Sequence, residues 1–214
     1  MRHDLVIFDF DGTLADSLTW LLSVFDDVAD RFGFRRLDRT NLAALRGFDA
    51  WQILERQEIA RWKVPRVVHH VRMLMQRDIA RIRLFPGIDQ ALQRIAASGT
   101  PLALASSNSL DNVRHVLGVE NTALFRHIEC GASISGKPAR LRRLLAASHA
   151  HPAATLFVGD EIRDLRAAQQ VGVRFGAVAW GYTRADVLVA HGADEHFATT
   201  AELAERLTAV PAHD

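Results

Sequence analysis

The chain has 214 residues, of which 49% are hydrophobic and 24% are charged, a balance typical of a globular protein with one large domain or a core plus a smaller inserted domain. Its formal net charge of +1 provides no strong field, which argues against nucleic acid or an anionic membrane as a partner. Cys130 is the single cysteine, so an intramolecular disulfide is excluded and a reducing cytoplasm is the expected location.

The N-terminal stretch 5–14 begins with an apolar, β-prone run that predicts a strand buried on both faces of a parallel sheet. Asp9 lies near the carboxyl end of this strand, Asp11 follows it, and Gly12 permits a sharp turn. Ligand crevices of open α/β sheets lie outside the carboxyl ends of the strands, so both carboxylates are expected to project into one. Because neighbouring carboxylates repel each other, Mg²⁺ is the simplest partner. A plain Asp-Gly turn is the alternative interpretation.

Residues 16–84 have the pattern of a helical unit without a convincing strand. Apolar residues recur at three- and four-residue spacing, and Gly47 and Pro65 separate the later segments. The pattern predicts helices over residues 18–32, 39–45, 51–59 and 67–82. The first strand has no sheet neighbour before residue 102, so this unit is expected to be inserted over the carboxyl edge of the sheet. We therefore expect an α/β core domain (1–15 and 85–214) and a helical cap domain (16–84).

After residues 85–87 the pattern changes to alternating helices and strands. Strands are predicted over 102–105, 127–130, 155–158 and 175–178, and helices over 88–98, 110–117, 139–148 and 163–171. This repetition is typical of a doubly wound parallel sheet, so the expected fold class is α/β with an inserted all-helical domain. No signal region precedes the first strand and no uncharged apolar run reaches about 18 residues, so we expect neither secretion nor membrane insertion.

Polar residues follow the predicted strand 102–105 at the edge of the sheet. Ser106, Ser107 and Asn108 lie just before a helix N-terminus, where hydroxyls, backbone N–H groups and the positive helix end suit anionic oxygens. One of residues 107–109 is expected to cap the helix, which leaves Ser106 for a ligand.

The segment 131–138 matches a phosphate-binding P-loop except at its last position. A P-loop requires Ser or Thr there, whereas Pro138 has neither a hydroxyl nor an N–H. We therefore disfavour a nucleotide site and interpret Lys137 as a point charge that neutralises a phosphate or a carboxylate. A surface lysine is the alternative.

Acidic residues also follow the predicted strand 155–158. Gly159 lets the backbone approach closely, Asp160 is expected to point into the crevice, and Asp164 lies four residues later on a helical turn that faces the same way. The alternatives are a helix cap at Asp160 and a solvated surface at Asp164.

The four aspartates of these motifs carry a formal charge of −4, and Lys137 returns +1. A converging cluster at −3 is strongly destabilising without a metal. One Mg²⁺ brings the charge to −1 and protonation of Asp11 brings it to zero, a state suited to receive a phosphate.

These motifs together resemble the haloacid dehalogenase superfamily. The resemblance covers essentially the whole chain and rests on residues in the family's order, namely Asp9-x-Asp11-Gly12-Thr13, Ser106, Lys137-Pro138 and Gly159-Asp160-x-x-x-Asp164. Residues 9–17, the helical unit and residues 85–87 are similar to the phosphoglycolate phosphatase-like branch with a helical (type C1) cap. The dehalogenases lack the second aspartate, so Asp11 favours phosphoryl transfer. One departure is Ala139-Arg140-Leu141, where many relatives have a second proline.

The resemblance implies a Rossmann-like core and a Mg²⁺-dependent phosphatase, phosphoglycolate phosphatase-like, that hydrolyses a small phosphomonoester. Asp9 would attack phosphorus to form an aspartyl-phosphate, and Asp11 would protonate the leaving alcohol and then accept a proton from water. Mg²⁺ would be held by Asp9, the Asp11 main-chain carbonyl and Asp160, with Asp164 orienting that shell. Whether Glu161 or Asp164 completes the shell, directly or through water, stays open.

The same resemblance assigns phosphoryl binding to Ser106, Ser107 and Lys137. Substrate specificity would lie in the cap, where Arg46, Phe48 and Trp51 are the candidate contacts. The alternative for the two aromatic residues is packing within the cap itself.

Other functions compete with a phosphatase that acts, as a monomer or homodimer, on a small phosphorylated metabolite. A phosphomutase of the same superfamily uses an arginine shortly after the cap glycine, where residues 47–50 offer none, although Arg46 is a substitute. A phosphoryl-accepting receiver domain needs neither Asp11 nor an insert after the first strand. An idle regulatory module is disfavoured because no site residue is missing.

Overall fold

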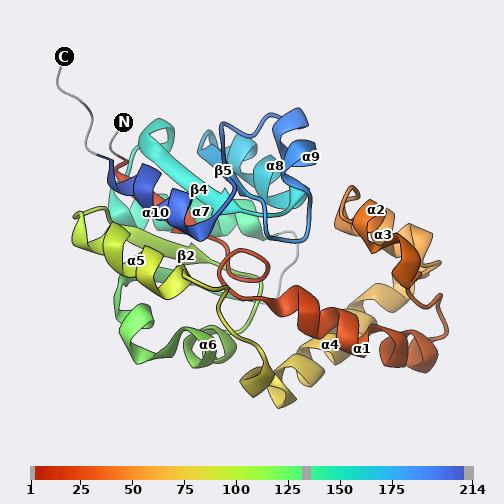
Figure 1. Cartoon of the computed structure of the whole chain (residues 1–214). Coiled ribbons are helices and arrows are strands. Elements are labelled where there is room, and N and C mark those ends of the chain that lie inside the picture. Colours follow the sequence, from red (N-terminus) through yellow and green to blue (C-terminus); the bar gives the residue numbers. More distant parts are fainter. Residues whose placement is uncertain (1–2, 132–135, 210–214) are drawn as a thin grey trace.

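A parallel β-sheet forms the centre of the molecule (Figure 1). The computed structural model describes residues 3–131 and 136–209, apart from the side chains of residues 41–43, 50 and 51. Within this part of the chain the sheet has six strands in the order β3-β2-β1-β4-β5-β6. The strands are β1 (Leu5–Phe8), β2 (Leu102–Ala105), β3 (Phe125–Glu129), β4 (Thr155–Gly159), β5 (Arg174–Val178) and β6 (Glu195–Phe197). The strand order reverses direction between β1 and β4, where open α/β sheets place their ligands.

Helices cover both faces of the sheet, as expected for a doubly wound fold (Figure 1). One face carries α5 (Ile88–Ala97), α6 (Leu110–Ala123) and α10 (Thr200–Thr208), and the other carries α7 (Lys137–Ser148), α8 (Ile162–Val171) and α9 (Ala185–Ala190). Alternate residues of β1 serve the two faces, because Val6 and Phe8 pack into the first core while Leu5 and Ile7 pack into the second. The expected α/β fold class is confirmed.

The segment between β1 and α5 is helical and extends to one side of the sheet (Figure 1). It contains α1 (Ser17–Phe32), α2 (Leu42–Leu45), α3 (Ala50–Arg56) and α4 (Val64–Arg77). Its two connections run side by side, because Asp16 N donates to Arg83 O at 2.9 Å and Phe85 N donates to Leu14 O at 2.9 Å. None of the helices in the described residues has the length and apolar character needed to cross a bilayer.

The predicted elements are present, but several of their bounds differ. The helix predicted over 51–59 ends at Arg56, the one predicted over 67–82 begins at Val64 and ends at Arg77, and the one predicted over 39–45 is α-helical only over Leu42–Leu45. The helix predicted over 110–117 continues to Ala123 through a kink at Gly118, whose φ of 72° is not helical. The structure adds α9, β6 and α10, for which the sequence pattern predicted nothing. The strand β6 has three residues, too few for an alternating pattern to register.

We expect Phe197→Ala to destabilise the protein because the ring is fully buried in β6 and the lost side chain leaves a cavity in the core. The free energy of unfolding in urea should fall by about 3–5 kcal/mol. Val119→Ala is the control, since that side chain is 88% exposed and its removal should change stability by less than about 0.5 kcal/mol. Equal effects of the two substitutions would contradict this placement of β6.

Candidate active site

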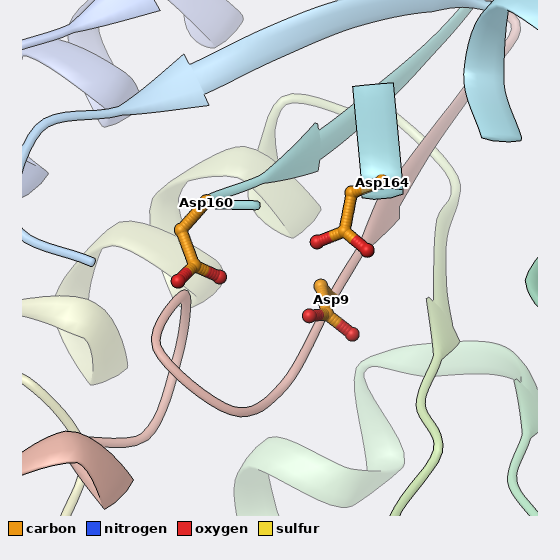
Figure 2. Close-up of side chains that lie close together, drawn as sticks. All are labelled: Asp9, Asp160 and Asp164. Atoms are coloured by element: carbon orange, nitrogen blue, oxygen red, sulfur yellow. The ribbon is translucent and has the colours of Figure 1, made fainter. Parts of the chain in front are cut away.

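Three buried aspartates meet at the carboxyl edge of the sheet, beside the reversal in strand order (Figure 2). Asp9 follows β1, Asp160 follows β4, and Asp164 lies in the first turn of α8. The two strands pair directly, and Asp9 N donates to Val158 O at 2.9 Å, so the first two carboxylates emerge together. One oxygen atom from each aspartate lies within 4.8 Å of the others, and all three residues are at most 2% exposed.

Lys137 lies against this cluster from the first turn of α7. Its Nζ is 2.8 Å from Asp9 Oδ1 and 2.5 Å from Asp164 Oδ1, and the residue is 4% exposed. Burial opposes the charge on Lys137, but Asp164 and Asp9 together raise its pKa above the usual value. The structure therefore places Lys137 between two carboxylates. This agrees with the interpretation of Lys137 as a neutralising charge and not with the alternative of a surface lysine.

The cluster still carries more negative than positive charge. The three aspartates and Lys137 have a formal sum of −2. Burial raises the pKa of Asp9 to about 8 against the opposing effect of Lys137. Burial also raises the pKa of Asp160 well above its usual value, and the neighbouring Glu161 and Asp9 add to that effect. A further cation beside Asp9 and Asp160 would lower their pKa values and so keep both carboxylates ionised.

The donor atoms fit a hard divalent cation. The Asp164 Oδ2 atom is buried and has no hydrogen-bond partner within the described residues, so a lone pair is left for another ligand. Asp160 is held firmly, since its two carboxylate oxygens accept hydrogen bonds from Thr13 Oγ1 at 2.8 Å and from Tyr182 N at 2.7 Å. Carboxylate oxygens are the ligands that Mg²⁺ prefers. Glu161 is directed elsewhere, into an ion pair with Arg163.

Two glycines leave room for the Asp160 side chain. Gly12 has a φ of +81°, which confirms the predicted sharp turn, and a Cβ atom there would lie 2.2 Å from Asp160 Oδ2. A Cβ atom on Gly181 would lie 2.1 Å from Asp160 Cβ. Any larger residue at either position would displace the carboxylate, so both glycines are part of the construction of the site.

Asp11 lies apart from the three-carboxylate cluster and has its own partner. Asn108 Nδ2 is 3.3 Å and 3.1 Å from the two Asp11 carboxylate oxygens. The orientation of this amide is fixed, because Asn108 Oδ1 accepts hydrogen bonds from Ser109 N at 2.8 Å and Asn112 Nδ2 at 2.9 Å. Burial raises the pKa of Asp11, which suits a group that donates a proton.

Sequence reasoning missed the contact of Asn108 with Asp11, because it considered Asn108 as part of the corner for anionic oxygens and as a possible helix cap. Ser109 is the actual cap of α6, because its side chain accepts from Asn112 N. Thr13 and Tyr182, the partners of Asp160, were missed as well. Thr13 had a local signal, since it belongs to the same motif as Asp9, whereas Tyr182 lies in a loop without any pattern.

The two serines of the predicted phosphate corner have different surroundings. Ser106 is 1% exposed, and its hydroxyl accepts a hydrogen bond from Asn108 N at 2.9 Å while keeping its own O–H to donate. Ser107 lines a cavity of about 600 Å³ together with Asp11, Asn108 and Lys137. Of the three residues of the predicted phosphate corner, Ser107 and Asn108 line the cavity.

The candidate contacts of the helical segment are only partly brought to that cavity. Phe48 lines it, with the Arg56 guanidinium 3.6 Å from the ring centre. Arg46 instead donates from Nη2 to the carbonyl oxygens of Ala179 at 3.1 Å and Gly181 at 2.7 Å. It therefore connects α2 to the loop that packs on Asp160. The side chain of Trp51 lies outside the described residues.

The chain is similar in sequence to known proteins. The model of the family "Haloacid dehalogenase-like hydrolase" matches residues 6–178. A phosphoglycolate phosphatase of Synechococcus elongatus is 33% identical over 204 residues, covering 95% of this chain and 96% of that protein. The tyrosine-protein kinase PtkA of Mycobacterium tuberculosis is 29% identical over 211 residues, covering 95% of this chain and 72% of that protein.

A solved structure is similar over its whole length. The putative phosphoglycolate phosphatase from Lactobacillus plantarum superposes with a TM-score of 0.81 at 20% sequence identity, covering 96% of this chain and 99% of that one. At this level of identity the likeness supports the fold, including the position of the helical segment beside the sheet.

We expect Lys137→Met to destabilise the protein strongly, because it leaves Asp9 and Asp164 facing each other without the buried cation between them. The free energy of unfolding, measured in urea with a chelator present, should fall by about 3–5 kcal/mol. The matched control is Lys63→Met, whose Nζ donates to Phe32 O at 2.7 Å at the surface of the helical segment. A loss for Lys137→Met no greater than for the control would show that the buried ion pairs do not form.

Proposed function

Since the chain belongs to the haloacid dehalogenase-like hydrolase family, we propose that it is a Mg²⁺-dependent phosphatase that hydrolyses a small phosphomonoester through an aspartyl-phosphate on Asp9. The observation that carries this proposal is the convergence of Asp9, Asp160 and Asp164 at the strand-order reversal, where Asp9 and Asp164 also pair with Lys137. The similarity to the Synechococcus phosphoglycolate phosphatase over 95% of the chain supports the same reaction class.

Asp9 and Asp11 divide the chemistry between them. An Asp9 carboxylate oxygen attacks phosphorus while the bond to the leaving oxygen breaks, and Asp11 gives its proton to that oxygen. Water then attacks the aspartyl-phosphate, Asp11 takes a proton from the water, and the acyl-phosphate bond breaks to release phosphate and restore Asp9. The raised pKa of Asp11 supports its role as the acid in the first step.

The metal would be held by Asp9, the Asp11 main-chain carbonyl and Asp160, with Asp164 orienting that shell. When bound, it neutralises charge on the phosphoryl group and keeps the carboxylates ionised. Together with Asp11 and Lys137 the aspartates carry −3, so one divalent ion leaves −1 before Asp11 is protonated. Lys137, Ser106 and Ser107 would bind phosphoryl oxygens, and Asn108 would position Asp11.

We also propose the division of the chain into a core of residues 1–15 and 85–214 and a helical cap of residues 16–84. The paired connections at Asp16 and Phe85 and the cavity between the helical segment and the sheet support this division. The cap would select the substrate, a small phosphorylated metabolite. A cytoplasmic location is proposed from the single cysteine alone.

The phosphomutase alternative receives less support. It needed Arg46 to hold a second phosphate, whereas the Arg46 guanidinium is bonded to the Ala179 and Gly181 carbonyls. In hydrolysis the phosphoryl group passes from Asp9 to water, so no arginine is needed to hold a second phosphate.

The first functional prediction concerns the metal. Hydrolysis of p-nitrophenyl phosphate should fall to background in a chelator and return when excess Mg²⁺ is added, because the carboxylate cluster repels an anionic substrate without a cation. The measurement is the release of p-nitrophenol and of phosphate. Undiminished activity in the chelator would contradict the metal-dependent mechanism.

The second functional prediction separates the two aspartates. Asp11→Asn should remain folded and bind Mg²⁺ while turnover falls on the order of 10²–10⁴-fold through loss of the acid. Asp9→Asn should abolish the phosphoenzyme, detected by rapid quench and mass spectrometry. Asp4→Asn, an exposed change at the opposite end of β1, is the control and should have wild-type turnover. A phosphoryl group found on any residue other than Asp9 would contradict the assignment.

A further inference from the structure

We propose that the substrate's leaving group is a large, uncharged, apolar alcohol that lies in the cavity between the helical segment and the sheet. This inference rests on the proposed phosphatase function and adds the class of substrate. Asp11, Asn108 and Lys137 line the same cavity, so an ester bound there presents its phosphate to the proposed catalytic groups. Aryl alcohols and alkyl alcohols of medium length have the required chemistry.

Two helices of the helical segment supply apolar faces to the cavity wall, and α8 adds Arg163, Arg166, Ala167 and Gln170. On α4 the lining residues recur at three- and four-residue spacing, and they include Val64, Val68, Val71 and Met75. On α1 they are Trp20, Leu21, Phe25 and Val28. Each helix thus turns one continuous apolar stripe toward the cavity. Such a surface stabilises an apolar ligand by removing it from water.

The cavity leads away from the reacting end along α4. Met75 Sδ is 3.1 Å from Asn108 Nδ2, the atom that also contacts Asp11, so this end of the helix adjoins the proton donor. Val64 lies eleven residues earlier on the same helix and also lines the cavity, about 16 Å away along the helix axis. A leaving group bonded to a phosphate at Asp9 would therefore extend along this stripe.

The size of the cavity argues against a two-carbon leaving group. Its volume of about 600 Å³ lies in the range of sites that enclose drug-sized molecules. Glycolate, the leaving group of phosphoglycolate, would fill only a small part of it. The part of the apolar wall that glycolate does not cover would stay in contact with water, and it would add nothing to the binding free energy.

The charges of the described wall are arranged in pairs or lie near the phosphate end. Arg163 pairs with Glu161 at 2.5 Å and Arg166 pairs with Asp49 at 3.2 Å. Arg72 lies close enough to Arg163 and to Asp11 for their charges to interact, so its cation belongs to the reacting end. An acidic leaving group would find its counter-charges already engaged, whereas an uncharged one needs none.

The test is a series of straight-chain alkyl phosphates from ethyl to octyl, together with phosphoglycolate, assayed by phosphate release with Mg²⁺ present. The leaving alcohols have similar acidity, so differences report binding in the cavity. We expect kcat/KM to rise about fourfold per methylene, the fold-change that corresponds to burying one methylene group. Octyl phosphate should therefore exceed both ethyl phosphate and phosphoglycolate by more than 100-fold.

Two neighbouring residues on α1 supply a matched pair of variants. Leu21 lines the cavity, whereas Leu22 is not among its described lining residues. Leu21→Trp should lower the ratio of kcat/KM for octyl over ethyl phosphate at least tenfold by filling the cavity. Leu22→Trp should leave this ratio unchanged. Circular dichroism checks that both variants are folded.

The outcomes separate this inference from the proposed function. If the esters are hydrolysed but kcat/KM stays constant or falls with chain length, the apolar leaving group is overturned and the phosphatase function stands. The same holds if phosphoglycolate is preferred and Arg72→Met abolishes that preference. A preference for octyl phosphate that Leu21→Trp does not alter would place the leaving group outside the cavity and also overturn the inference. Hydrolysis of p-nitrophenyl phosphate without hydrolysis of octyl phosphate would also overturn the inference and leave the phosphatase intact. If neither the series nor p-nitrophenyl phosphate is hydrolysed, the proposed function itself fails.

Discussion

The burial of like charges at one edge of the sheet is the constraint on which the rest of this structure depends. Asp9, Asp160 and Asp164 are held almost out of water within 4.8 Å of one another, and Lys137 offsets only part of their charge. Such an arrangement is tolerated because each carboxylate is placed by a rigid element, either the end of a central strand or the first turn of a helix. The doubly wound core can be understood as the scaffold that holds these groups together against their repulsion.

The choice of lysine at position 137 follows from the same crowding. The chain contains 24 arginines and two lysines, so arginine is its ordinary cation. The ammonium group of Lys137 is compact enough to contact Asp9 and Asp164 at once, whereas a guanidinium is a planar fork that pairs side-on with one carboxylate. Arg163 and Arg166, which have more room at the cavity wall, each pair with a single acid.

The sequence predicted the parts of the site that lie next to strong local patterns. Asp9, Asp11, Asp160 and Lys137 each adjoin an apolar strand or begin a helix, so their convergence followed from the rule that parallel strands end at one edge. Asn108 and Tyr182 were missed because their roles depend on side-chain direction and on a loop from a distant part of the chain. The elements after residue 178 were missed because β6 and α9 are short and gain their stability from packing on β5. Arg46 was assigned to the substrate because distance along the chain does not show that α2 reaches the loop after β5.

That loop, residues 179–184, makes hydrogen bonds in two directions. Gly181 O accepts from Arg46, and Arg184 N donates to Arg46 O, while Tyr182 N donates to Asp160 Oδ2 and Thr183 N donates to Asp160 O. A single short segment therefore carries both the attachment of the helical unit and the support of one carboxylate. Thermodynamic linkage is reciprocal: if a ligand at Asp160 strengthened the Arg46 contact by some factor, that contact would raise the affinity at Asp160 by the same factor. Residues 179–184 are thus the segment through which a ligand at Asp160 and the attachment of α2 would act on each other.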